Sequence, residues 1–275
     1  MRVPQNRPMN ETAEELPLAQ EGVKFVEYEL PLTERMRTFL RLEFLYQQVL
    51  FHAEDQADFG TRAAIGGLLE IATILGRGDV RADALKELEK QADSLRRYGS
   101  EPGVDQSRLG SLLDNVEQLR SDLINIGPHF LQAIKESEFL SAIKHRSSIP
   151  GGTCVFDLPD YAFWLSLPFS TRSQQIEQWL TGLRPLCDAV AEVLWLIREM
   201  SDPEELVASN GMYQRSSDQK EQLNLVRVLL PPDSDLYTEI SGGQHRITVR
   251  FLRFADVNVS PIQVSENVSF LLGLY

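Results

Sequence analysis

The chain has 275 residues, a formal net charge of −13 and a pI of about 4.8, with 43% hydrophobic and 24% charged residues. This length suits two modest domains or one large one, and the composition is ordinary for a globular protein. General affinity for nucleic acid or for an anionic membrane requires a basic surface, so the acidic balance argues against both, while a local basic patch stays compatible with it.

The sequence shows neither a targeting signal nor a redox motif. No apolar run reaches the length of a transmembrane helix, and the first residues have no apolar core of the signal-peptide type. The two cysteines, Cys154 and Cys187, match no metal or redox spacing. The sequence therefore predicts a cytoplasmic protein with no membrane insertion and no disulfide framework.

The first thirty residues divide into two segments. Residues 1–21 are rich in Pro, Asn and Glu and lack periodicity, which predicts a disordered extension. Within residues 22–31, apolar and polar side chains alternate from Val23 to Leu30, which predicts a strand with one wet face that ends at Pro31. Such a strand has no partner among helices, so we expect it to join the β domain.

Apolar residues recur at helical spacing over residues 32–147, which predicts a helical domain. The first helix runs to about His52 with an apolar face wide enough for the centre of a bundle, and the second spans about 58–75. The predicted caps and stops of these helices are Thr33, Gly76, Asp79 and Asp105.

The third and fourth helices carry leucines at the 3-4 spacing of a coiled coil, so we expect an antiparallel helical hairpin. One interpretation is that this apolar stripe only joins the two helices to each other. The other, which Leu113 favours by widening the stripe, is that spare apolar surface forms a dimer through the helical domain.

The sequence pattern changes from helical spacing to short alternating runs over residues 147–159. Pro150 and the Gly151-Gly152 pair break the incoming helix, and Val155-Phe156 is predicted to be a strand. Residues 148–275 are then expected to form a β-strand domain, with two packed helices and one antiparallel sheet whose face lies against them. The predicted strands are 205–208, 211–215, 223–230, 236–240, 244–254 and 264–272. The fold class is α+β: a helical bundle domain plus an antiparallel β-strand domain.

The strand over residues 244–254 holds the most suggestive residues. Alternation places Ile247, Val249 and Phe251 toward the core, and it places Arg246 and Arg250 together on the exposed face, about 13 Å apart at ~3.3 Å per residue. Two guanidinium groups on one strand face suit carboxylates of a peptide. The alternative, which composition alone favours, is a solvated face paired with the protein's own acids.

Signals for catalysis are weak. The four histidines fall in unrelated segments, the acidic residues form no metal-binding spacing, and the paired glycines make no phosphate loop. Cys154 is interpreted as a small buried residue and not as a nucleophile. We therefore predict no catalytic residue, metal or cofactor. A small-molecule-binding or hydrolase-like domain, with its site between sheet and helices, remains the alternative function.

Several separated motifs occur in a recognisable order. They are Met36-Arg37-Thr38, Leu40-Arg41, Glu43-Phe44-Leu45, Arg77-Gly78, Val80-Arg81, Leu85-Lys86-Glu87-Leu88, Pro102-Gly103-Val104-Asp105-Gln106-Ser107-Arg108, Ser148-Ile149-Pro150-Gly151-Gly152, Phe156-Asp157-Leu158-Pro159, Asn210-Gly211, Tyr213-Gln214, Leu236-Tyr237, Ile240-Ser241-Gly242, Arg246 and Arg250-Phe251. Each is weak alone, and together they are specific. From about Phe25 to Leu252 the chain resembles the ZapD family of bacterial cell-division proteins.

The resemblance implies a homodimer without catalysis or cofactor. It implies that the partner is FtsZ, the tubulin-like division GTPase, bound through its C-terminal peptide, and that the dimer cross-links FtsZ filaments and stabilises the Z-ring at mid-cell. It places the filament-binding arginines at Arg77, Arg246 and Arg250, with Arg81 extending the patch. The resemblance therefore favours a binding role for the exposed face of strand 244–254 over the interpretation of that face as merely solvated.

Overall fold

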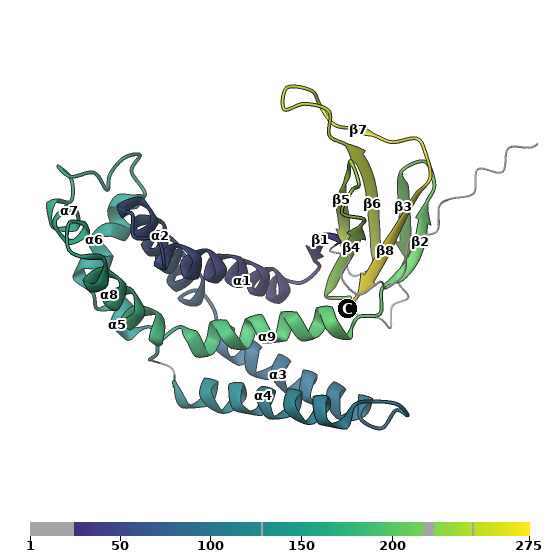
Figure 1. Ribbon diagram of the computed structural model, residues 1–275, viewed down its shortest axis with the longest axis horizontal. Helices are drawn as coiled ribbons and strands as arrows, with labels where there is room; N and C mark the ends of the chain where they lie inside the picture. Colours follow the sequence, from purple (N-terminus) through teal and green to yellow (C-terminus); the bar gives the residue numbers. More distant parts are fainter. Residues whose placement is uncertain (1–24, 128, 217–222, 244) are drawn as a thin grey trace, which may run out of the picture. The chain divides into compact units, whose positions relative to one another are not determined.

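The computed structural model describes residues 25–127, 129–216, 223–243 and 245–275 (Figure 1). The extension predicted over residues 1–21 lies outside this part. The described residues form two compact units, a β unit that contains those of 25–36 and 200–275 and a helical unit that contains those of 37–199. Helices and antiparallel sheets occupy different parts of the chain, so the predicted α+β class is confirmed.

The strands of the β unit form two antiparallel sheets with the orders β1-β4-β8-β2 and β3-β6-β5, and β7 pairs with β6. Their bounds are β1 Val26–Pro31, β2 Glu204–Ala208, β3 Met212–Ser216, β4 Leu225–Leu230, β5 Leu236–Gly243, β6 Arg246–Arg253, β7 Ile262–Gln263 and β8 Val268–Leu274. β1 pairs with β4 from Val26 opposite Leu230 to Pro31 opposite Leu225, as predicted for a strand that joins the β domain.

The core of the β unit lies between the two sheets. Apolar side chains of β4 and β8 pack with those of β6, and Val228, Phe251 and Phe270 are 0% exposed. The prediction of one sheet against two helices was therefore wrong: each sheet has its own apolar face, and the two faces bury each other as in a β-sandwich. The predicted core parity of Ile247, Val249 and Phe251 is confirmed.

A tight hairpin connects β2 to β3. Asn210 and Gly211 both have positive φ, 51° and 64°, which matches the right-handed twist of the flanking strands and suits Asn-Gly. At Gly211 a Cβ would lie 2.3 Å from the carbonyl oxygen of Val264, so only glycine fits this turn. This hairpin fixes the position of β3 beside β6, which is the strand that carries the two predicted arginines.

The described helices lie in the helical unit, except for residues 34–36 at the start of α1 and Met200 at the end of α9, which belong to the β unit. Their bounds are α1 Glu34–Ala53, α2 Asp58–Leu75, α3 Val80–Tyr98, α4 Gln106–Asn125, α5 Gln132–Lys135, α6 Glu138–Ser147, α7 Pro159–Leu165, α8 Phe169–Thr181 and α9 Arg184–Met200. The predicted caps are confirmed. The hydroxyl of Thr33 accepts a hydrogen bond from the Met36 amide, and the carboxylates of Asp79 and Asp105 accept hydrogen bonds from amides in the first turns of α3 and α4.

The α3–α4 hairpin closes mainly on itself. Leu88 and Leu95 of α3 and Val116 and Leu123 of α4 are buried, while Leu113 is only half-buried. The predicted antiparallel hairpin is thus confirmed, and most of its apolar stripe joins the two helices to each other.

Two local predictions around residue 150 differ from the structure. Val155 and Phe156 are in turns and not in a strand, and both are exposed, because no strand among the described residues pairs with this segment. The Arg62 side chain instead donates a hydrogen bond to the Thr153 carbonyl at 3.0 Å. The predicted domain boundary at 147/148 also differs from the observed division, which places α7, α8 and α9 in the helical unit.

α2 packs closely against α1. A Cβ at Gly67 would lie 2.6 Å from a methyl of Val49, so this glycine permits the close approach of the two helices. Among the described helices, none alone is long and apolar enough to cross a membrane, and only α2 and α3 together, bent by 83°, pass such a test.

Candidate functional site

The outward face of β6 carries Arg246, Thr248 and Arg250. Burial alternates along the strand, so the two arginines are exposed while Ile247 and Val249 are 1% and 0% exposed. The prediction that both arginines share the exposed face of one strand is confirmed. β6 is the middle strand of its sheet, so this face is held on both sides by β3 and β5.

Each of these arginines already has a partner on a neighbouring strand. Arg250 forms an ion pair with Glu239, which lies directly opposite on β5, and both side chains are 48% exposed. Arg246 donates a hydrogen bond from Nη2 to Oε1 of Gln214 at 2.8 Å. One arginine therefore faces an acid of its own chain, as the alternative interpretation anticipated. The other faces only a neutral amide among the residues that the structure describes.

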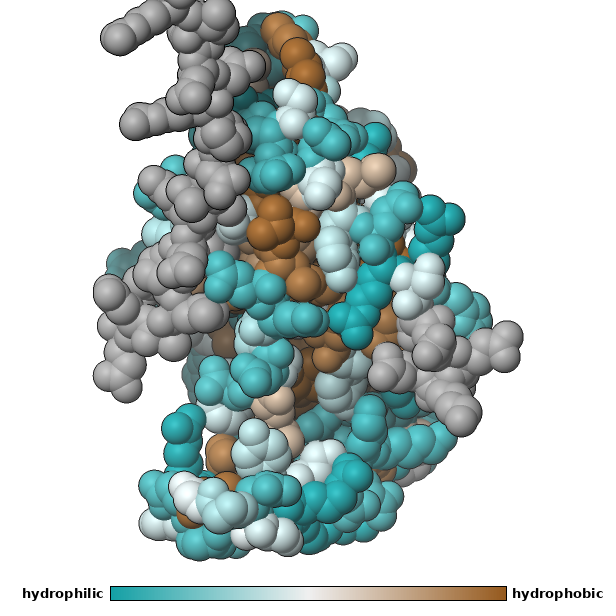
Figure 2. Space-filling view, turned by 90° about the vertical axis from the view of Figure 1, so that its right-hand side faces the viewer, coloured by the Kyte–Doolittle hydropathy of each residue, from teal (hydrophilic) through white to brown (hydrophobic). Residues whose placement is uncertain are grey.

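Apolar side chains adjoin the arginines on the same face. Met212 lies directly opposite Arg250 on β3 and is 41% exposed, and Tyr237, opposite Leu252, is partly exposed. Mixed surfaces of this kind are common on the protein: on the face in Figure 2, hydrophobic side chains gather between hydrophilic ones. A peptide lying along β6 would thus meet guanidinium groups and apolar surface together.

A third arginine at the end of β6 behaves differently. Arg253 donates hydrogen bonds at 2.7 Å to both Asp235 and Glu266, so two carboxylates hold its guanidinium. Backbone N–H donors and then Arg253 itself hold the pKa of the Glu266 carboxyl below its ordinary value. Arg253 therefore serves the fold at this edge, and it is a poorer candidate for binding a ligand than Arg246 or Arg250.

The two remaining predicted residues, Arg77 and Arg81, lie in the helical unit, and their surroundings differ. Arg81 donates hydrogen bonds from Nε to the Leu123 carbonyl at 2.7 Å and from Nη2 to the Ile124 carbonyl at 3.0 Å. These carbonyls belong to the last turn of α4, so Arg81 caps that helix and fixes the α3–α4 hairpin. We assign it a positioning role within the helical unit.

Arg77 lies in the turn between α2 and α3, at the rim of a hollow that the sequence did not reveal. Three further basic side chains line this hollow: Lys135, Lys144 and His145. They come from the last turns of α5 and α6, and a cluster of basic residues in the run Lys144-His145-Arg146 was the only signal in the sequence. Nothing in the spacing indicated that α5 and α6 bring them to Arg77.

Comparison with known proteins now decides the family. The ZapD family model, described as a cell division protein, matches residues 40–250. The chain is 38% identical over 246 residues to the cell division protein ZapD of Escherichia coli, covering 90% of this chain and 97% of that one. It is 34% identical over 245 residues to the ZapD of Methylococcus capsulatus, covering 89% and 96%. The chain belongs to the ZapD family.

Membership gives the protein a role in cell division. The ZapD family is a cell-division family and not an enzyme family. In the part of the chain that the structure describes, no three His, Cys, Asp or Glu side chains are grouped to hold a metal ion. The thiol of Cys187 is buried, and burial raises its pKa to about 12, so it stays protonated and unreactive at neutral pH.

Proposed function

We propose that this ZapD protein binds the C-terminal peptide of FtsZ and, as a homodimer in the cytoplasm, cross-links FtsZ filaments at the mid-cell division site. The observation that carries the proposal is the outward face of β6. There, Arg246 and Arg250 are exposed on a rigid middle strand, beside the apolar side chain of Met212. Guanidinium groups in this arrangement suit the carboxylates of an acidic peptide, because their paired donors match carboxylate geometry.

The charge of the whole chain makes this local patch necessary. With a net charge of −13, the protein repels acidic partners at long range, so attraction must come from a few exposed cations at short range. A solvent-exposed ion pair such as Arg250–Glu239 contributes only about 0–1 kcal/mol, so a competing carboxylate can replace Glu239 at little cost. The arginine face is therefore available to a ligand in spite of its internal partners.

Cosedimentation with polymerised FtsZ tests the proposal. We expect the protein to pellet with the filaments and bundle them, and an excess of free FtsZ C-terminal peptide to release it. Raising the salt to ~0.5 M should weaken binding strongly, because exposed charge pairs are then screened within a few ångströms. If the protein pellets equally well with FtsZ that lacks its C-terminal peptide, the proposed contact is wrong.

Cross-linking also requires two binding sites in one particle, and we propose that the helical unit supplies the dimer contact. The apolar stripe of α3 and α4 is mostly buried within their own hairpin. By contrast, α1 carries two exposed aromatic side chains seven residues apart: Phe44 is 67% exposed and Phe51 is 74% exposed. Residues at this spacing share one helix face. A stripe of this kind is suited to a second copy of the chain.

We expect a dimer at micromolar concentration by light scattering, and a monomer for Phe44→Glu/Phe51→Glu. The matched control is Phe163→Glu, which changes another phenylalanine of the helical unit that is 69% exposed. A wild-type protein that scatters as a monomer would contradict the dimer itself. A dimer that survives the α1 substitutions would place its contact elsewhere.

A further inference from the structure

An acidic stretch of the sequence precedes β1. Residues 8–21, here called the acidic segment, contain no Lys, Arg or His. Their charged residues are Glu11, Glu14, Glu15 and Glu21, and their larger apolar residues are Met9, Leu16 and Leu18. The ZapD family model matches residues 40–250, so family membership does not account for this segment. Its carboxylates and apolar side chains have the chemistry that suits the arginine face of β6.

The beginning of β1 lies beside the sheet that carries the arginine face. β1 contacts β5, which is the neighbour of β6 in that sheet. Tyr28 of β1 and Tyr237 of β5 are neighbours: burial and then the Tyr237 phenol raise the pKa of Tyr28. Tyr237 shares its face of β5 with Glu239, which is the partner of Arg250. The chain that enters β1 therefore arrives near the edge of the arginine face.

The acidic segment is long enough to cross this face. Neighbouring strands lie ~4.8 Å apart and residues rise ~3.3 Å along a strand, so Arg246 and Arg250 are both within ~30 Å of Val26 at the start of β1. An extended chain gains ~3.3 Å per residue, so Glu21 can reach ~17 Å from Val26 and Glu15 can reach ~36 Å. Glutamates of the segment can therefore meet both arginines.

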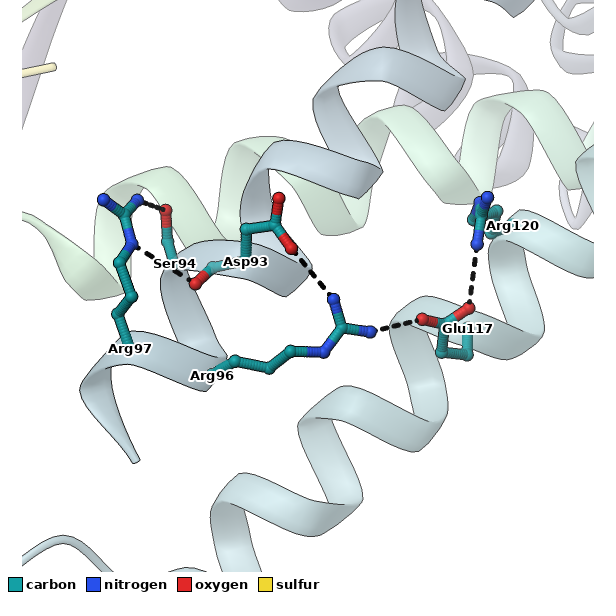
Figure 3. A network of polar contacts seen from close by, with 6 residues as sticks. All are labelled: Asp93, Ser94, Arg96, Arg97, Glu117 and Arg120. Atoms are coloured by element: carbon teal, nitrogen blue, oxygen red, sulfur yellow. Dashed lines mark hydrogen bonds and ion pairs between the residues drawn. The ribbon is translucent and has the colours of Figure 1, made fainter. Parts of the chain in front are cut away.

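The arginine face offers a carboxylate more donors than an ordinary basic surface of this protein does. Figure 3 shows Arg96 of α3 between Asp93 at 2.9 Å and Glu117 of α4 at 2.8 Å, so two carboxylates hold its guanidinium. On β6, by contrast, Arg246 contacts only the neutral amide of Gln214 among the described residues. A guanidinium has five N–H donors, so most of those of Arg246 are open to an acidic ligand.

We propose that the acidic segment occupies the arginine face of β6 as an internal ligand, with glutamates at Arg246 and Arg250 and an apolar side chain on Met212. Each exposed ion pair is weak, but the tether to β1 gives the segment an effective concentration of ~1 mM at the face. Contacts of ~0.3 mM affinity then fill the face about three quarters of the time.

The consequence is autoinhibition, and this step rests on the proposed function. The FtsZ C-terminal peptide must displace the acidic segment, so its apparent affinity is reduced by the fraction of chains in which the face is open. A single FtsZ molecule is thereby disfavoured. A filament presents many peptides to both sites of a dimer and regains affinity through multivalency. The segment thus restricts cross-linking to assembled filaments.

Fluorescence anisotropy of a labelled FtsZ C-terminal peptide, titrated with the full-length chain, tests the competition. Glu14→Gln/Glu15→Gln/Glu21→Gln removes three carboxylates of the segment, and we expect the affinity to rise at least ~threefold. A control variant makes the same change of net charge at three exposed glutamates of the helical unit and should leave the affinity within ~1.5-fold. Its substitutions are Glu70→Gln, Glu89→Gln and Glu101→Gln.

A disulfide test reports the contact without FtsZ. In a full-length chain with Cys154→Ser, Leu16→Cys is combined either with Thr248→Cys, between the two arginines, or with Val207→Cys, 46% exposed on β2 of the other sheet. Cys187 is buried and does not interfere. We expect the disulfide at position 248 to form at least ~fivefold faster than the one at position 207, because the contact raises the local thiol concentration. Charge reversal of both β6 arginines should remove this difference.

The outcomes separate the inference from the proposed function. Equal rates at positions 248 and 207, or a difference that survives the charge reversal, overturn the inference. If the FtsZ peptide binds but the glutamate variant matches its control, the inference fails and the proposed function stands. If the FtsZ peptide binds no form of the chain, the proposed function fails, and the disulfide rates alone decide whether the segment occupies the arginine face.

Discussion

The arginine face of β6 and the hollow beside Arg77 present cations in opposite ways. On β6, Arg246 and Arg250 extend from a flat sheet and already contact Gln214 and Glu239. Around the hollow, the basic side chains have no partner among the described residues. A ligand of the flat face must therefore compete with groups of the protein's own chain in weak, exchangeable contacts, whereas the cations around the hollow have no such competitor.

The largest effect is expected from the inward side of β6. Ile247 is 1% exposed between the two sheets, so Ile247→Glu places a carboxylate in the sandwich core without a partner. The penalty of several kcal/mol is comparable with the whole stability of a typical domain. We expect loss of the cooperative thermal transition of the β unit, measured by circular dichroism.

Arg250→Glu is the matched control on the opposite side of the same strand. It removes an exposed ion pair and opens no cavity, so its melting temperature should fall by only a few degrees. If both variants melt alike, the assignment of inner and outer faces on β6 is wrong.

The second effect concerns function. Arg246→Glu or Arg250→Glu should abolish cross-linking of FtsZ filaments in the sedimentation assay, with the protein folded. Loss of a charge-assisted hydrogen bond costs about 1.5–3 kcal/mol, and reversal adds repulsion, so affinity should fall more than ~100-fold. Bundling needs both sites of a dimer at once and should fail more sharply than simple binding.

Arg97→Glu on α3 is the control, because it makes the same charge change at an exposed arginine whose guanidinium donates only to the Asp93 carbonyl and the Ser94 hydroxyl of its own helix among the described residues. Normal bundling by either β6 variant would remove the arginine face from the proposed function. Equal loss in the α3 control would show that net charge, and not this face, governs binding.

The sequence predicted those features that depend on short-range pattern. Alternation of apolar and polar residues along 246–251 correctly predicted which side chains of β6 point inward. The capping residues Thr33, Asp79 and Asp105 correctly predicted where three helices begin. These predictions succeed because strand parity and capping are local physical rules that tertiary contacts rarely override.

Apart from the local strand predicted at Val155-Phe156, the failures concern contacts between distant segments. Two sheets that bury each other leave the same alternation as one sheet against helices, so the sandwich was not predictable from pattern alone. Lys135 and Lys144 come from different helices, α5 and α6. No residue near Arg77 in the sequence indicates that these two lysines line the same hollow as Arg77. The ion pair of Arg250 with Glu239 depends on the β5–β6 register, which composition does not determine.

The smallest effect should come from the internal partner of Arg250. If Glu239 competes with the carboxylates of a ligand, then Glu239→Gln removes the ionic part of its contact with Arg250 while retaining the shape of the side chain. An exposed pair is worth at most about 1 kcal/mol, so affinity for the FtsZ C-terminal peptide should rise by no more than ~fivefold. Glu117→Gln in the α3–α4 hairpin removes the same charge elsewhere and should leave this affinity unchanged, because Glu117 faces Arg96 and Arg120. Parallel anisotropy titrations of the labelled peptide with both variants measure the two affinities. A decrease for Glu239→Gln would show instead that Glu239 holds Arg250 in its binding geometry, and the contrast between a face with internal competitors and a hollow without them would no longer stand.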